Sequence, residues 1–224
     1  MVSIDTVYQK VLAFANKEQR GYITPQEFNL FADQAQMEIF EQYFYDLNQH
    51  QRIHGSSEEY SDMSHNLNEK IAFFESVAAV TQGGTLINAT DLYRLGTVTS
   101  SIGVEVEEVQ QNEILYLVKS PLTVPTANRP VYVRTGPLTL NMFPSGPAAC
   151  TYVRKPLKPS WGYVVVNGKA LYNPSTVVNF ELHPAEESEL VYKILKFAGI
   201  SMKKDDIARA GQVQEQLQVQ QEKQ

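Results

Sequence analysis

Cysteine is almost absent from this 224-residue chain, because Cys150 is the only one. A single thiol cannot close an internal disulfide, and it has no partner cysteines for a structural zinc site. In its segment Cys150 alternates with Thr151, a pattern more typical of a small core residue than of a nucleophile. A reducing compartment is the simplest interpretation of this cysteine usage.

Long apolar runs are missing as well. No stretch approaches the ~20 residues that a bilayer-spanning helix needs. Residues 1–19 form an amphipathic pattern that includes Asp5, rather than a basic segment followed by an apolar run. We therefore expect a soluble protein without a secretion signal or a membrane partner.

Charged residues make up only 20% of the chain, and the net charge is −6. This mild acidity argues against a surface that grips nucleic-acid phosphates, but it is compatible with a channel through which nucleic acid slides. The hydrophobic content of 43% is enough for a real core, in one large domain or two small ones. Disorder of the whole chain is excluded.

Catalytic signatures are also missing. There is no G-x-S-x-G elbow, no G-x-x-x-x-G-K-[ST] loop and no G-x-G-x-x-G fingerprint. His50 and His54 are four residues apart without an HExxH pattern, and His183 stands where a helix N-cap is wanted. We predict no catalytic residue, no metal site and no cofactor.

The most informative positive feature is the segment of residues 20–47, which predicts a long amphipathic helix. Thr24 suits the N-cap, Pro25 suits the first helical position, and Glu27 can reach back to the Thr24 backbone in a capping box. Apolar residues then recur at three- and four-residue steps along one face: Phe28, Phe31, Ala32, Ala35, Ile39, Phe40, Tyr43, Phe44 and Leu47.

Helices are predicted on both sides of this segment and near the end of the chain. The first spans about residues 4–15 with Ser3 as its cap, and a third runs from about residue 58 to 75. A further helix follows His183 and ends near Gly199. From residue 205 the chain is rich in glutamine, with a thin apolar stripe that is marginal as an isolated helix.

Between the helices, residues 77–180 alternate short β-type runs with Gly, Pro and Asn, which predicts an antiparallel sheet. Expected strands include residues 95–100 and 104–109 around Gly103, a hairpin over residues 131–142, and residues 149–155. Residues 111–118 are predicted to form a short helix.

The expected class is therefore α+β: a bundle of long N-terminal helices and a C-terminal helix, with a central antiparallel β-sheet insertion. The predicted divisions are residues 1–76 for the N-terminal helices and 77–182 for the β-rich domain. Residues 183–200 are predicted as a bundle helix and 201–224 as a C-terminal helical arm.

Two groups of apolar residues are candidate contacts with other proteins. Phe40, Tyr43 and Phe44 have acidic rather than basic neighbours, so base stacking is disfavoured. Their stripe is longer than the first helix can cover, so we expect them to meet the third helix, the C-terminal helix or an adjacent subunit. In the C-terminal arm, the candidate contacts are Ile207, Val213 and Leu217, and the loop residue Trp161 is predicted to anchor a further contact.

Three stretches resemble tailed-phage head-to-tail connector proteins of the tail tubular protein A type, also called adaptor or neck ring proteins. They are residues 16–44, the pair 92–98 (LYRLGTV) and 129–146 (RPVYVRTGPLTLNMFPSG), and the junction from TYVRKPLKPSWGY at 151–163 to the helix ending at 200. Residues 49–70 add a helical section that departs from the family pattern.

The resemblance implies a structural virion protein of the neck, between capsid and tail, assembled in the host cytoplasm. It implies a homo-oligomeric ring of twelve copies that contacts the portal protein and a downstream tail or nozzle protein. Double-stranded DNA would pass through the bore without sequence-specific contacts during ejection.

Two other classes stay open from the residues alone. One is a soluble binding module in which the sheet presents a ligand face. The other is a carbohydrate-active hydrolase with Glu105 and Glu107 as acid and base, since alternating positions share one strand face.

Overall fold

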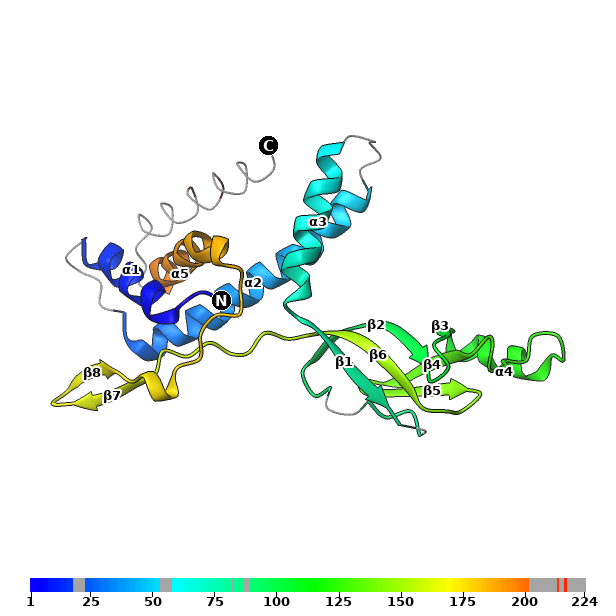
Figure 1. Cartoon of the computed structure of the whole chain (residues 1–224). Coiled ribbons are helices and arrows are strands. Elements are labelled where there is room, and N and C mark those ends of the chain that lie inside the picture. The colour runs from blue at the N-terminus through cyan, green and yellow to red at the C-terminus, as the bar shows by residue number, and fades with distance from the viewer. Residues whose placement is uncertain are drawn as a thin grey trace. The chain divides into compact units, whose positions relative to one another are not determined.

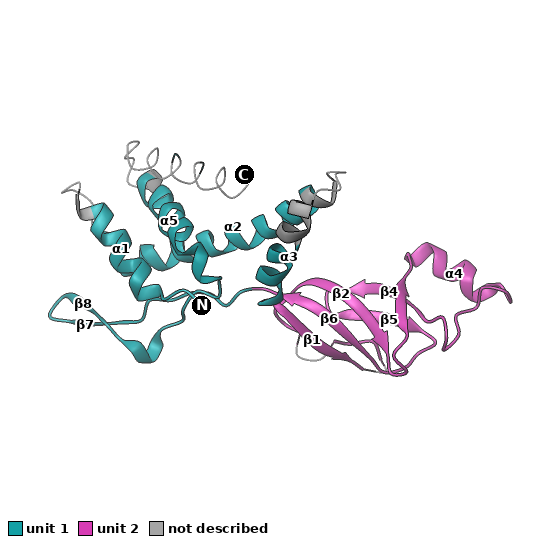
Figure 2. Cartoon of the chain, turned by 45° about the horizontal axis from the view of Figure 1, so that its top comes forward, with its two compact units in different colours: residues 1–73, 156–224 teal, residues 74–155 magenta. Residues whose placement is uncertain are grey.

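The structure, a computed structural model of the chain, describes residues 1–17, 23–52, 58–81, 83–86 and 89–201 and the single positions 213 and 216 (Figure 1). The chain divides into a helical unit, Met1–Phe73 with Pro156–Gln224, and a β unit, Phe74–Lys155 (Figure 2). Helices precede and follow the sheet region along the chain, which confirms the predicted α+β class.

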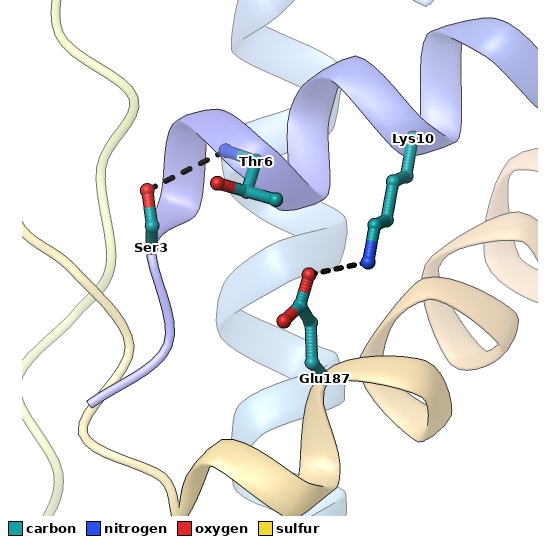
Figure 3. A network of polar contacts seen from close by, with 4 residues as sticks. All are labelled: Ser3, Thr6, Lys10 and Glu187. Carbon is teal, nitrogen blue, oxygen red and sulfur yellow. Dashed lines mark hydrogen bonds and ion pairs between the residues drawn. The ribbon is translucent and has the colours of Figure 1, made fainter.

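The first helix, α1 (Ile4–Lys17), begins as its sequence predicts. The Ser3 hydroxyl oxygen accepts the Thr6 backbone N–H at 3.5 Å, so Ser3 caps the first turn (Figure 3). One turn further on, the Lys10 ammonium lies 2.6 Å from a carboxylate oxygen of Glu187, which stands at the start of the C-terminal helix. This ion pair links two helices that are far apart in sequence.

The long helix, α2 (Pro25–Arg52), begins with the predicted capping box. The Glu27 carboxylate accepts the Thr24 hydroxyl at 2.7 Å and the Thr24 backbone N–H at 3.0 Å, and the Glu27 N–H donates back to the Thr24 hydroxyl at 3.3 Å. The hydroxyl contact, followed by the backbone contact, holds the pKa of the Glu27 carboxyl below its ordinary value.

The helical unit is completed by α3 (Glu58–Ala72), the short η2 (Pro184–Glu186) and α5 (Glu187–Ser201). His183 caps this last pair as predicted, because its Nδ1 accepts the Ala185 N–H at 3.3 Å. The apolar faces of α1, α2 and α5 pack together, and their fully buried residues are Ile4, Val7, Val11, Phe28, Ala32, Ala35, Phe40, Leu190, Ile194 and Ala198.

The β unit holds a curled six-stranded sheet in the spatial order β1-β6-β2-β3-β4-β5. Its strands are β1 (Glu75–Val80), β2 (Leu92–Ser100), β3 (Glu105–Glu108), β4 (Val131–Gly136), β5 (Thr139–Phe143) and β6 (Ala148–Arg154). The side chains of Val98, Val106, Leu140, Cys150 and Tyr152 lie in its core. Burial raises the pKa of the Cys150 thiol, as expected for a core residue.

The expectation of a wholly antiparallel sheet is wrong at one pair, since β3 and β4 run parallel. The chain between them forms α4 (Gln111–Lys119) and a loop before it returns. A connection of this length lets the next strand enter in the same direction, whereas a tight turn would force the antiparallel one.

The boundary at residue 182 also differs from the prediction. Residues 156–182 group with the helical unit rather than with the β unit. They contain a separate hairpin of β7 (Tyr163–Val166) and β8 (Lys169–Tyr172) and the turn η1 (Pro174–Thr176). The cause is a set of contacts to the helices: Val2 pairs with Phe180, and the Ile4 N–H donates to the Asn179 side chain at 3.1 Å.

Candidate functional site

The β7–β8 hairpin is the first of two surfaces on which apolar side chains lie exposed outside the core. Its tight turn is Asn167–Gly168, where both residues have positive φ, of 50° and 75°. This pair is the preferred sequence for a two-residue hairpin turn, because asparagine and glycine tolerate that conformation best. Sequence-based prediction missed the hairpin, although the Asn-Gly signal between two β-type runs could have found it.

The base of the hairpin is fixed by Trp161. The centre of its ring lies 5.9 Å from that of Tyr163, 5.8 Å from that of Tyr172 and 4.4 Å from that of Tyr8 of α1. The indole N–H donates to the Asp5 carboxylate at 2.9 Å. Trp161 is buried, so the contact predicted for it is made within the chain.

Above this base the hairpin side chains are open to solvent. Val165 is 62% exposed, and the neighbouring exposed residues are Val164, Val166, Leu171 and Tyr172. Opposite residues pair as Val164 with Leu171 and Val165 with Ala170, so both faces of the ribbon carry apolar groups. An exposed apolar strand of this kind is a template for contact with another chain.

The second surface lies on α4 and the loop after it, which we call the α4 surface. Ile114 and Leu117 of α4 face inward and pack with Val131 and Val133 of β4. The outward residues Leu115 and Tyr116 are 62% and 77% exposed, and Leu122 in the loop is 95% exposed. Because α4 is apolar on both faces, packing on the sheet leaves a second apolar face uncovered.

The β unit also has a polar cavity of about 520 Å³ between β2, β3 and β4. Glu105, Glu107 and Glu108 line it together with Tyr132, whose hydroxyl donates to the Glu108 carboxylate at 3.2 Å. Burial, and then the nearby Glu108 charge, raise the pKa of Tyr132 to about 12. The cavity thus brings together the two carboxylates predicted as hydrolase candidates and adds a third.

The predicted interface residues have separate positions. Phe40, Tyr43 and Phe44 are buried in the helical unit, where the Phe40 and Phe44 rings meet edge to face at 5.1 Å. The Lys70 ammonium of α3 lies 5.4 Å from the centre of the Tyr43 ring. The three side chains therefore belong to the core of the helical unit, and Tyr43 contacts the third helix, α3, through Lys70. Val213 is exposed, whereas Ile207 and Leu217 lie outside the described residues.

Buried charges in the helical unit were not predicted from the sequence. The Lys70 ammonium lies 2.5 Å from a carboxylate oxygen of Glu186, and that of Lys193 lies 3.4 Å from one of Glu189. Glu186, Glu189 and Lys193 are nearly inaccessible to solvent. Each charge has a partner of opposite sign, so these pairs act in helix packing rather than as an open site.

Among the described residues, no group of three or more His, Cys, Asp and Glu side chains is placed to hold a metal ion. None of the described helices combines the length and the apolar character that a membrane crossing requires. No protein-family model matches the sequence, and no curated protein matches it.

Proposed function

We propose that the chain is a non-enzymatic subunit of an oligomeric ring, acting as the head-to-tail adaptor of a tailed-phage particle. The observation that carries this proposal is the presence of two separate exposed apolar surfaces, the β7–β8 hairpin and the α4 surface, one on each unit. A ring subunit needs different surfaces for its neighbours and for the components above and below it.

The sequence resemblance supports the same proposal and supplies the partners. The ring would consist of about twelve copies, with the portal protein on one side, the downstream tail or nozzle protein on the other, and DNA in the bore. The net charge of −6 agrees with a bore that does not hold the phosphate backbone. The α4 surface is the proposed contact with a flanking component, because its exposed Leu115, Tyr116 and Leu122 resemble the apolar anchors of interface cores.

Negative-stain electron microscopy of the purified full chain over a concentration series tests the proposal. Closed rings with one narrow size distribution are the expected result. A second sample lacking residues 205–224 tests the arm: we expect the truncated chain to keep its fold and to lose binding to the portal. Globular monomers at every concentration of the full chain, with no ring on added portal, would exclude the adaptor function.

A second candidate function is a binding module or hydrolase, which the carboxylate-lined cavity favours. Its volume of about 520 Å³ is in the range of small-molecule sites. Glu105→Gln and Glu107→Gln variants, compared with Glu113→Gln on α4, would distinguish the candidates in assays of soluble polysaccharide hydrolysis. Activity that disappears only in the two cavity variants would support the hydrolase and contradict the structural role.

A further inference from the structure

The β7–β8 hairpin has two free edges. It forms a two-stranded sheet of its own, so within the described residues no further strand lies beside either β7 or β8. An isolated two-stranded ribbon is marginally stable in water, and only the base of this one is fixed, by Trp161. The unpaired backbone N–H and C=O groups of β7, beside its exposed valines, can pair with a strand of another chain.

A matching acceptor is β1, the outer strand of the six-stranded sheet. Of the two outer strands, β5 is covered along its edge by residues 84–86, where Leu86 N–H donates to Leu138 O and Leu140 N–H donates to Gly84 O. The same segment closes only the Val80 end of β1. The Glu75–Ala79 part of β1 stays open among the described residues, and its Val77 side chain is 71% exposed.

The paired strands carry single charges of opposite sign. Residues 163–172, which form the hairpin, have one basic residue, Lys169, and no Asp or Glu. The β1 strand has one acidic residue, the exposed Glu75, and no Lys or Arg. The hairpin, with Lys169 beside its turn, is therefore complementary in charge to the β1 strand of a second copy.

We propose that the β7–β8 hairpin of one copy adds to the β1 edge of a second copy and extends its sheet. This inference rests on the proposed ring function and names the contact that builds the ring. The two surfaces are different, so each copy donates a hairpin to one neighbour and accepts one from the other. Such a head-to-tail contact closes into a ring when its rotation allows, whereas a self-complementary contact stops at a dimer.

Site-specific cross-linking of the full chain tests this pairing. Two single-cysteine proteins are prepared on a Cys150→Ser background, one with Val165→Cys in the hairpin and one with Val77→Cys in β1. They are mixed and treated with a short bismaleimide. We expect the mixed cross-linked dimer to form about tenfold faster than with Leu115→Cys in place of Val165→Cys, because pairing raises the effective concentration of the two thiols.

Leu115 is the matched control because its exposed fraction equals that of Val165, 62%. Equal cross-linking rates for the Val165→Cys and Leu115→Cys proteins would overturn the inference. Electron microscopy separates this failure from failure of the ring itself. Rings that disappear with Val165→Asp but remain with Leu115→Asp support the inference. Rings that remain with both variants overturn it and leave the adaptor function standing, and wild-type protein without rings overturns the adaptor function.

Discussion

The side-chain oxygen of Gln36 accepts the backbone N–H of Glu181 at 3.1 Å, although the two residues are 145 positions apart. The other end of the same side chain donates to the Leu157 carbonyl at 2.8 Å, and the Glu181 carboxylate accepts the Leu157 N–H at 2.8 Å. Gln36 is fully buried in α2. Gln36 thus bonds to both ends of residues 157–181, the segment that contains the β7–β8 hairpin, and holds them against α2.

Replacing Gln36 with leucine keeps the side-chain volume and removes both bonds. We expect the helical unit to lose roughly 1–3 kcal/mol of unfolding free energy, because buried backbone groups lose their partners. Trp161 is the only tryptophan and lies in this unit, so its fluorescence during urea unfolding reports the change. Gln49→Leu on the exposed part of α2 is the control, with an expected change within about 0.5 kcal/mol. Equal midpoints for the two variants would contradict the assignment.

Gly162 is required at the base of the hairpin for steric reasons. A Cβ at this position would meet the Thr176 hydroxyl and would lie 2.7 Å from the Asn173 carbonyl oxygen. Since the carbonyl belongs to the backbone, Gly162→Ala is expected to destabilise the helical unit by about 1–3 kcal/mol. The same substitution at Gly146, where a Cβ meets nothing within 4 Å, is expected to be nearly neutral. Thermal unfolding of both variants, followed by circular dichroism, would refute this if Gly162→Ala were also neutral.

The capping box at the start of α2 predicts a loss of about 1 kcal/mol for Thr24→Ala, because the hydroxyl both donates to Glu27 and accepts its N–H. Chemical unfolding at neutral pH measures this loss. Thr90→Ala, at an exposed turn of the β unit, is the comparison and should leave the helical transition unchanged. A Thr24→Ala protein as stable as the wild type would show that the box does not contribute.

The same box predicts a pH dependence. The pKa of Glu27 is lowered in the folded chain, so its contribution is complete above the ordinary carboxyl pKa and is lost as the pH falls through the lowered value. The stability difference between wild type and Glu27→Gln should therefore be largest near neutral pH and disappear in acid. A difference that is constant from neutral to acidic pH would contradict this linkage.

The raised pKa of Tyr132 predicts a change in stability at alkaline pH. Its pKa rises from 10.0 to about 12 on folding, so the unfolded chain ionises first and the β unit loses stability between these two values. Tyr132→Phe removes that loss, and its unfolding free energy should fall less steeply over the same range. Tyr152→Phe is a useful comparison, because the Tyr152 pKa is also raised by burial and by its bond to Asp91. Identical alkaline profiles for Tyr132→Phe and wild type would refute the prediction.

Local signals in the sequence predicted much of the helical unit and the β4–β5 hairpin. Thr24, Glu27 and His183 make the caps that their positions indicate, because capping depends on residues three or fewer positions apart. The parallel β3–β4 pair and the Gln36–Glu181 bond join distant segments, so no periodic pattern encodes them. The buried pairs of Lys70 and Lys193 were missed for the same reason, since charged residues usually indicate an exposed face.

Sequence patterns also could not separate the exposed apolar residues from the buried ones. Periodicity located α4, but it could not tell which of its apolar residues pack on β4 and which stay exposed. It also placed Phe40 and Phe44 in a candidate interface, since a long apolar stripe has the same pattern whether a neighbouring helix or another subunit covers it.

If copies of this chain assemble into a closed ring, the mass of the assembly gives the number of copies. Mass photometry of the purified full chain, alone and with the portal protein added, compares each species with the 25.3 kDa monomer. We expect one discrete species of about twelve copies, which Val165→Asp reduces to monomer. A monomer under all conditions, or an open-ended series of masses without a preferred closed state, would contradict it.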